Sequence, residues 1–416
     1  MMLRHIPFLK NVFLYSITAF GGPQAHIAMM MKNFVQRTPY VTEKELLEYN
    51  AFCNLLPGAS SSQTVTLIGY KRGGIPLAIM TLIVWILPAC FLMGAFSFLF
   101  EYIDQKSLHT NIFKFIPPLA VGFLAYASVA AFRVSIKNTI TWAIMAICAI
   151  ATYLFFKTPW VFPVLIILGG LSTNISHKRI PQTETKPKKI KWWNIWLFAI
   201  IFLIAGITSE IARQNDWPNR KPINLFENLY RMGSLVFGGG HVLMPMMYEQ
   251  FCVRPEIIQQ KRPYDSLNLI KIDKDDMTTG MGIVRAIPGP VFSIASFTGG
   301  MALKDYGFPM QLAGCIIGTI SIFLPSALLV LFFFPIWNNL KKYSAIYRSL
   351  EGINAAVVGI MIAASFYIMK DISLVEIKTN TLINILVMLL TFVLLQNTRV
   401  ASPILVFFCL LLGYLF

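Results

Sequence analysis

Two short stretches of the chain combine adjacent glycines with a histidine. The first reads Phe-Gly-Gly-Pro-Gln-Ala-His over residues 20–26, and the second reads Phe-Gly-Gly-Gly-His over residues 237–241. Glycine lets the backbone take positive φ and approach a ligand closely, and histidine can donate hydrogen bonds or carry a proton. Small residues also permit tight helix packing, so a transport site and a helix contact are both open interpretations. The candidate substrate-binding residues here are Gly21, Gly22, His26, Gly238, Gly239, Gly240 and His241.

A second pair of motifs carries proline and glycine together. Leu-Pro-Gly-Ala at 56–59 is followed by three serines and a glutamine, and Ile-Pro-Gly-Pro at 287–290 is followed by Val, Phe and Ser. Proline is accepted in the first turn of a helix and poorly tolerated inside it, so each motif predicts a helix start. Unpaired N–H groups at a helix start favour an anion, although a serine-capped kink of purely structural use is the alternative. The candidates are Pro57, Gly58, Ser60, Ser61, Ser62, Gln63, Pro288, Gly289 and Ser293.

Arg285 lies three residues before Pro288 in the otherwise apolar stretch 281–287. An arginine at membrane depth is costly and indicates function, and its planar fork suits oxyanions. Its counterpart in the first motif is the neutral Asn54, so we count both as candidate substrate contacts. The alternatives are that Arg285 extends to the membrane surface or pairs with an acid such as Asp275 or Asp276.

Sequence motifs of the common enzyme classes are absent. The sequence contains no HExxH, no GxSxG and no phosphate-binding loop with its lysine. Its five histidines have no metal-ligand spacing, and none of its six cysteines lies within four residues of another. We therefore expect no catalytic residues, no metal and no cofactor, and ATP-driven transport is not expected.

The elements that position these residues must lie in a membrane. Of 416 residues, 56% are hydrophobic and only 13% are charged, against about 25% charged in soluble domains. A spanning helix needs about 20 mainly apolar residues, and the alternating pattern of a β-barrel is missing. The sequence predicts an all-α integral membrane protein. The apolar blocks are Leu77–Phe100, Phe115–Phe132, Thr139–Phe156, Trp193–Ile211, Met310–Pro335, Ala355–Met369 and Thr381–Leu395.

Five motifs recur in the same order in the two halves of the chain. Their separation grows slowly from 217 to 242 residues, as small loop insertions would produce. The pattern predicts two homologous multi-helix repeats, as in many transporters. We expect an N-terminal repeat at 1–176, a connecting region at 177–223 and a C-terminal repeat at 224–416. The matched positions are Gly21 and Gly238, Pro57 and Pro288, Pro88 and Pro325, Val121 and Val358, and Asn138 and Asn380.

The connecting region holds a basic linker at 177–191 and one apolar helix at 193–211. One extra crossing between two copies predicts that the second copy is inverted. Basic residues are expected in cytoplasmic loops, and the pair Lys71 and Arg72 is assigned to one of them. The first outer loop, Lys32–Lys44, is an exception to this charge pattern.

This topology predicts a multi-pass protein of the cytoplasmic (inner) membrane with a cytoplasmic N-terminus. It has at most 13 segments, of which Phe8–Met31 and Leu46–Gly69 are expected to be broken or re-entrant. We expect no cleaved signal peptide. The net charge of +16 is then explained by topology, and no nucleic-acid partner is expected. Recognition of anionic lipid by the linker is an alternative use of its charge.

At the glycine and proline motifs the chain resembles the chromate ion transporter family, in its long two-domain form. The resemblance rests on Phe20–Ile27, Phe237–Gly240, Leu56–Ala59 and Ile287–Pro290. It implies export of chromate from the cytoplasm, with sulfate as a close structural analogue. Two positions depart from the family pattern: Ala59 replaces a usual proline, and Arg285 stands where a neutral polar residue is expected.

The sequence thus predicts a secondary active transporter that moves a small inorganic oxyanion across the lipid bilayer by alternating access. Two other classes of function stay open. One is a membrane-embedded enzyme acting on a lipid phosphate, for which Glu48 and Glu210 are the nearest acids. The other is an anion channel. The sequence leaves open the exact anion, the coupling ion and whether the chain forms a homo-oligomer.

Overall fold

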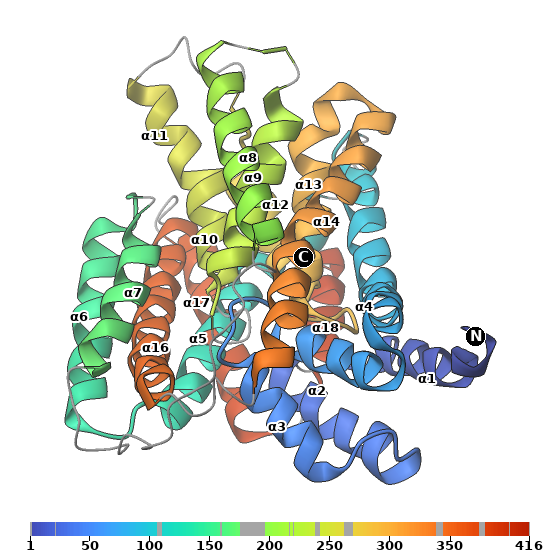
Figure 1. Cartoon of the computed structure of the whole chain (residues 1–416). Coiled ribbons are helices and arrows are strands. Elements are labelled where there is room, and N and C mark those ends of the chain that lie inside the picture. The colour runs from blue at the N-terminus through green and yellow to red at the C-terminus, as the bar shows by residue number, and fades with distance from the viewer. Residues whose placement is uncertain are drawn as a thin grey trace. The chain divides into compact units, whose positions relative to one another are not determined.

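The computed structural model of the chain is helical throughout the part it describes (Figure 1). Among those residues, five helices are long and apolar enough to cross a membrane, and no strand is present. These findings confirm the predicted all-α membrane class. The structure describes residues 2–20, 22–105, 110–158, 160–174, 196–215, 217–218, 220–237, 242–261, 269–337, 344–373, 379–398 and 400–415.

The chain forms two compact units, and each unit takes segments from both repeats. Unit 1 comprises Met1–Lys106, Lys189–Gly240 and Val284–Trp337. Unit 2 comprises Ser107–Lys188, His241–Ile283 and Asn338–Phe416. The proline-glycine motifs of both repeats therefore belong to unit 1. The boundaries predicted at residues 176 and 224 follow the sequence repeat, and they stay a prediction about domains.

The first part of unit 1 contains the interruptions predicted from the sequence. A short 3₁₀ turn, η1 (Met2–His5), leads into α1 (Ile6–Ser16), and α2 (Gly22–Met30) follows after a break and continues as the π-helix η2 (Met31–Arg37). Helix α3 (Glu43–Cys53) starts at a capping box of Thr42 and Glu45. A second break separates it from α4 (Ser60–Gln105). The helix interruptions expected within 8–31 and 46–69 are thus confirmed.

Helix α4 bends at two glycines in its first third. Gly73 has φ −154° and ψ 21°, and Gly74 has φ 67° and ψ −159°, a conformation that glycine tolerates best. The sequence analysis placed Lys71 and Arg72 in a loop between two membrane segments. The structure has both residues in the last helical turn before the two-glycine break, so the break lies directly after them, and their side of the membrane stays a prediction.

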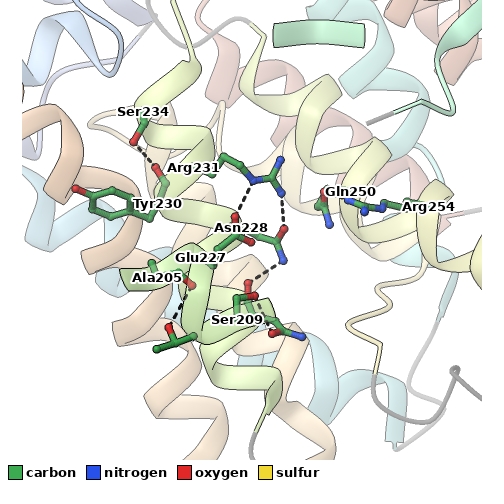
Figure 2. A network of polar contacts seen from close by, with 11 residues as sticks. Ala205, Ser209, Glu227, Asn228, Tyr230, Arg231, Ser234, Gln250 and Arg254 are labelled. Atoms are coloured by element: carbon green, nitrogen blue, oxygen red, sulfur yellow. Dashed lines mark hydrogen bonds and ion pairs between the residues drawn. The ribbon is translucent and has the colours of Figure 1, made fainter. Parts of the chain in front are cut away.

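The second part of unit 1 begins with α8 (Trp196–Gln214) and α9 (Arg220–Leu235), which pack against each other. Arg231 donates through Nε to Glu227 Oε1 at 2.8 Å and through Nη2 to Asn228 Oδ1 at 2.7 Å (Figure 2). Ser209 Oγ of α8 donates to Asn224 Oδ1 of α9 at 3.0 Å. The polar face of α9 is thus satisfied locally and joined to the helix that belongs to neither repeat.

The remaining helices of unit 1 pack through small residues. The 3₁₀ turn η8 (Val291–Ser293) leads into α13 (Ile294–Leu303), and η9 (Lys304–Tyr306) separates it from α14 (Phe308–Phe333). A Cβ on Gly299 or Gly314 would collide with the backbone of the other glycine. Such close contact is typical of helix pairs in membranes. Helix α14 also packs against α4 and α9, and η10 (Phe334–Ile336) follows it.

Unit 2 is organised around its longest helix, α16 (Ser344–Ser373). It packs against α6 (Thr139–Phe155), α7 (Val161–Asn174) and α5 (Ile116–Ser135), as Figure 1 shows. Gly352 of α16 lies against Gly169 of α7, backbone to backbone. The other elements of unit 2 are η3 (Thr110–Phe113), α10 (Leu243–Tyr248), η6 (Glu249–Val253), α11 (Arg254–Lys261), α12 (Lys274–Ile283), α17 (Thr379–Asn397) and α18 (Ser402–Leu415).

Candidate functional site

The two proline-glycine turns of unit 1 have nearly the same conformation and exchange partners between the repeats. Gly58 has φ 113° and Gly289 has φ 114°. The Gly58 N–H donates to the carbonyl of Val236 at 2.7 Å, just before the second glycine stretch. The Gly289 N–H donates to the carbonyl of Ala19 at 2.8 Å, just before the first one. Such a reciprocal exchange is the pattern expected of two turns related by a pseudo-two-fold axis.

At both turns a residue of the other repeat lies so close that it leaves no space for a side chain. A Cβ on Gly58 would lie 2.7 Å from the Cβ of Ser326, and one on Gly289 would lie 2.8 Å from the Cβ of Ala89. Ala89 and Ser326 are themselves matched positions, each directly after a proline of α4 or α14. Both turns therefore require glycine for two reasons, namely a positive φ and a close contact with the other repeat.

A helix starts directly after each turn, as the proline motifs predict. Helix α4 begins at Ser60, and the 3₁₀ turn η8 leads into α13 after Pro290. The side chains of the first four residues of α4, from Ser60 to Gln63, are all buried. The first N–H groups of a helix have no partner inside it, so the start of α4 combines backbone and hydroxyl donors in a buried place. Anion binding there stays a prediction.

Helices α1, α2 and α4 bring a histidine, two serines and two aromatic rings together. His26 Nδ1 lies 3.2 Å from Ser61 Oγ, and Trp85 Nε1 donates to Ser62 Oγ at 2.9 Å. The Trp85 ring stacks on Tyr15 at 4.6 Å and meets His26 edge-on at 5.4 Å. Tyr15 Oη closes the cluster by donating to the carbonyl of His26 at 3.1 Å. Neither aromatic residue was predicted from the sequence, because an aromatic residue in an apolar block resembles any lipid-facing or core residue.

Three buried polar atoms of this region have no hydrogen-bond partner among the residues that the structure describes. They are His26 Nε2, Gln63 Oε1 and Ser293 Oγ. The amide of Gln63 is oriented by its Nε2, which donates to the carbonyls of Pro57 at 2.9 Å and Ser326 at 3.4 Å. Buried polar atoms without a partner usually meet water or a ligand. The region thus offers both hydrogen-bond donors and acceptors to a small polar ligand.

The other predicted site residues lie in different surroundings. Gly22 opens α2 with φ 78° and open space where a Cβ would stand. Asn54 is exposed at the end of α3, and Arg285 is half-buried in the turn that follows α12. Pro57 and Pro288 are half-buried within their turns. Gly21, Gly238, Gly239, Gly240 and His241 lie outside the described residues, as does the basic linker.

Unit 2 contains a charged network that the sequence analysis also missed. Lys274 Nζ lies 3.0 Å from Glu256 Oε2 and 3.2 Å from Asp371 Oδ2. Tyr248 Oη donates to the same Asp371 oxygen at 2.8 Å. Asp371 is the last residue of a helix long and apolar enough to cross a membrane. An acid at the end of an apolar block was the feature of the sequence that could have indicated this network. The 237-residue offset aligns Asp371 with the apolar Val134, so the acid of this network is not repeated at the aligned position.

Comparison with known proteins decides the family. The family model described as chromate transporter matches residues 6–173 and 223–414, one region for each predicted repeat. The chain belongs to the chromate transporter family. The recognition made from the glycine and proline motifs is therefore confirmed, and the chain is a multi-pass membrane transporter.

Known relatives match most of the chain. An uncharacterized transporter of Methanocaldococcus jannaschii is 26% identical over 99% of this chain and 95% of its own length. A chromate transport protein of Cupriavidus metallidurans is 23% identical over 97% and 92%, respectively. A chromate transport protein of Pseudomonas aeruginosa is 22% identical over 85% of this chain and 77% of its own length. No solved structure has significant similarity to this chain.

Proposed function

We propose that this protein is a secondary active transporter that exports chromate or a related tetrahedral oxyanion, such as sulfate, by alternating access. The single observation that supports this most is the pair of exchanged turns in unit 1. Each turn starts a helix, and the start of α4 carries buried serine hydroxyls beside His26. Matched broken helices in two repeats are the usual place for a transporter's substrate site.

In the proposed mechanism the oxyanion exchanges its water shell for fixed donors. The free N–H groups at the start of α4 and the Nε2 atom of His26 supply hydrogen bonds, and Ser61 orients His26 through its contact with Nδ1. When His26 Nδ1 accepts from the Ser61 hydroxyl, its Nε2 carries the hydrogen and can donate. Arg285 supplies positive charge from the second turn. We also propose that the protein lies in the inner membrane with its N-terminus in the cytoplasm, and that its two repeats are inverted relative to each other.

Two observations bear on the enzyme alternative. Glu48 Oε1 accepts a hydrogen bond from Trp337 Nε1 at 3.0 Å, and the exposed Glu210 pairs with Arg213 at 2.6 Å. The two acids lie on different helices, α3 and α8, and each is engaged in its own contact. Hydrolysis of a lipid phosphate needs an acid and a base positioned within reach of one proton. Neither Glu48 nor Glu210 is arranged in this way.

The test is uptake of radiolabelled chromate into inverted membrane vesicles, with sulfate as competitor and a protonophore as control. Saturable uptake that sulfate inhibits is the expected result, and its loss with protonophore would assign the coupling ion to the proton. Ser61→Ala and Arg285→Ala should each lower uptake at least tenfold. Ser172→Ala is the matched control, since Ser172 is exposed on α7 in unit 2. Ionic conductance without saturation would instead favour the channel.

A further inference from the structure

A basic pocket of about 410 Å³ opens in unit 1, outside the turns described above. It is lined by Arg4, His5, Tyr40, Lys71 and Arg72. The pocket lies where η1 meets the two-glycine break of α4, because a Cβ on Gly73 would stand 3.4 Å from His5 Nε2. None of the lining residues belongs to the candidate substrate site.

The hydrogen bond inside the pocket fixes the tautomer of His5. Arg4 Nε donates to His5 Nε2 at 3.1 Å. An arginine nitrogen can only donate, so His5 Nε2 must be the acceptor and its Nδ1 must carry the hydrogen. That Nδ1 is buried and has no hydrogen-bond partner among the described side chains. His5 therefore presents an unused donor.

Arg72 presents a second unused donor in a fixed orientation. Its guanidinium carbon lies 4.3 Å from the centre of the Tyr40 ring and 5.3 Å from that of Phe8. Such stacking over aromatic faces holds the guanidinium plane in place. Its Nε is buried and makes no hydrogen bond to the described part of the chain. Asn11 Nδ2 donates to Tyr40 Oη at 2.9 Å, which leaves the tyrosine's own hydrogen free to donate.

The charges around the pocket leave a positive excess. Arg4, Lys71 and Arg72 are cations, and Glu45 is the acid that contacts them, through Lys71 Nζ at 2.7 Å. Burial and the charges of Arg4 and Arg72 lower the pKa of His5, so its neutral form is favoured. The described side chains of the pocket thus supply cations and spare donors, and an anion with several acceptor oxygens is the ligand that would complete it.

We propose that this pocket binds a phosphate-type oxyanion as a second anion site, separate from the proposed transport site. The group is either a free inorganic anion or the phosphate of an anionic lipid headgroup, and both present the same tetrahedral oxygens. Arg72 supplies the planar fork, His5 and Tyr40 supply single donors, and Arg4 and Lys71 supply charge.

The test measures calorimetric binding of inorganic phosphate, and separately of short-chain phosphatidylglycerol, to the purified full chain in a zwitterionic detergent. Arg72→Gln and Arg4→Gln should each weaken binding about tenfold, which corresponds to about 1.4 kcal/mol. Lys10→Gln is the matched control, because Lys10 is an exposed cation on the adjoining α1. Ser61→Ala alters only the proposed transport site, so it should leave unchanged the part of the binding that is lost in Arg72→Gln.

The possible results of these binding measurements distinguish a free-anion site, a lipid-headgroup site and the absence of a second site. Phosphate binding that falls with Arg72→Gln supports a free-anion site, and phosphatidylglycerol binding alone supports a lipid headgroup. Equal losses in Arg72→Gln and Lys10→Gln, or no binding of either probe, would overturn the proposal. If Arg72→Gln lowers the unfolding temperature, Arg72→Lys takes its place as the test variant. It retains the positive charge but loses the planar guanidinium, and it should still bind phosphate more weakly than the wild type. A loss in Ser61→Ala but not in Arg72→Gln would place the anion in the transport site instead.

Discussion

The two proline-glycine turns share one backbone frame but carry different side chains. Gly58 and Gly289 match in φ, in hydrogen-bond partner and in the residue that excludes a side chain. Three members of the polar cluster beside the first turn, His26, Ser61 and Trp85, align with the apolar Leu243, Phe292 and Ile322, whereas Ser62 aligns with Ser293. Duplication has thus preserved the frame, while these three hydrogen-bonding side chains occur in the first copy.

The largest predicted effect is the loss of the frame itself. Gly58→Ala and Gly289→Ala should each destabilise the protein by about 2–4 kcal/mol, from a disfavoured φ and a forced contact. Thermal unfolding in detergent measures this. Gly307→Ala is the control, because Gly307 also has positive φ (85°) but open space around it. If only one of the two turns were sensitive, the frame would not be symmetric.

The second prediction concerns the difference in side chains between the aligned Ser61 and Phe292. Ser61→Ala should lower chromate uptake at least tenfold per folded molecule, since it removes a hydroxyl beside His26. Phe292→Leu keeps an apolar side chain of similar volume and should leave uptake per molecule nearly unchanged. Comparable losses in both variants would show that both copies contribute equally to the substrate site.

A smaller effect is expected for the tryptophan of the polar cluster. Trp85→Phe removes the N–H that donates to Ser62 and keeps a ring against Tyr15. The expected cost is about 1 kcal/mol, the usual net value of one hydrogen bond, with some repacking added. Trp160→Phe at an exposed position is the control. Equal unfolding temperatures for the wild type and Trp85→Phe would mean that the hydrogen bond does not hold this cluster together.

The last prediction compares two aligned serines, of which Ser293 should show the smallest effect of all. Ser62→Ala leaves the Trp85 N–H without an acceptor and should cost about 1–3 kcal/mol. Ser293→Ala removes an oxygen that has no partner among the described residues, and stability should change by less than about 0.5 kcal/mol. Unfolding in denaturant compares the two variants directly. A large cost at Ser293 would reveal a contact in the second copy that compensates for its apolar neighbours.

The sequence was enough to predict the helix interruptions and the helix starts after Pro57 and Pro288, because glycine and proline act locally on the backbone. It could not predict that Gly58 pairs with Val236, since no local pattern encodes a hydrogen bond across so many residues. Two charges followed by two glycines are typical of a connection between helices, and α4 is indeed interrupted at Gly73 and Gly74.

The reciprocal hydrogen bonds of the turns also bear on how the chain is made. When the first repeat leaves the ribosome, the Gly58 N–H and the Ala19 carbonyl still lack their partners, which lie more than 170 residues further along the chain. The contact that completes each turn is therefore among the last to form during biogenesis. A chain truncated before residue 236 would leave the Gly58 N–H of the first turn without its acceptor, and it would also lack the Gly289 N–H that donates to the Ala19 carbonyl.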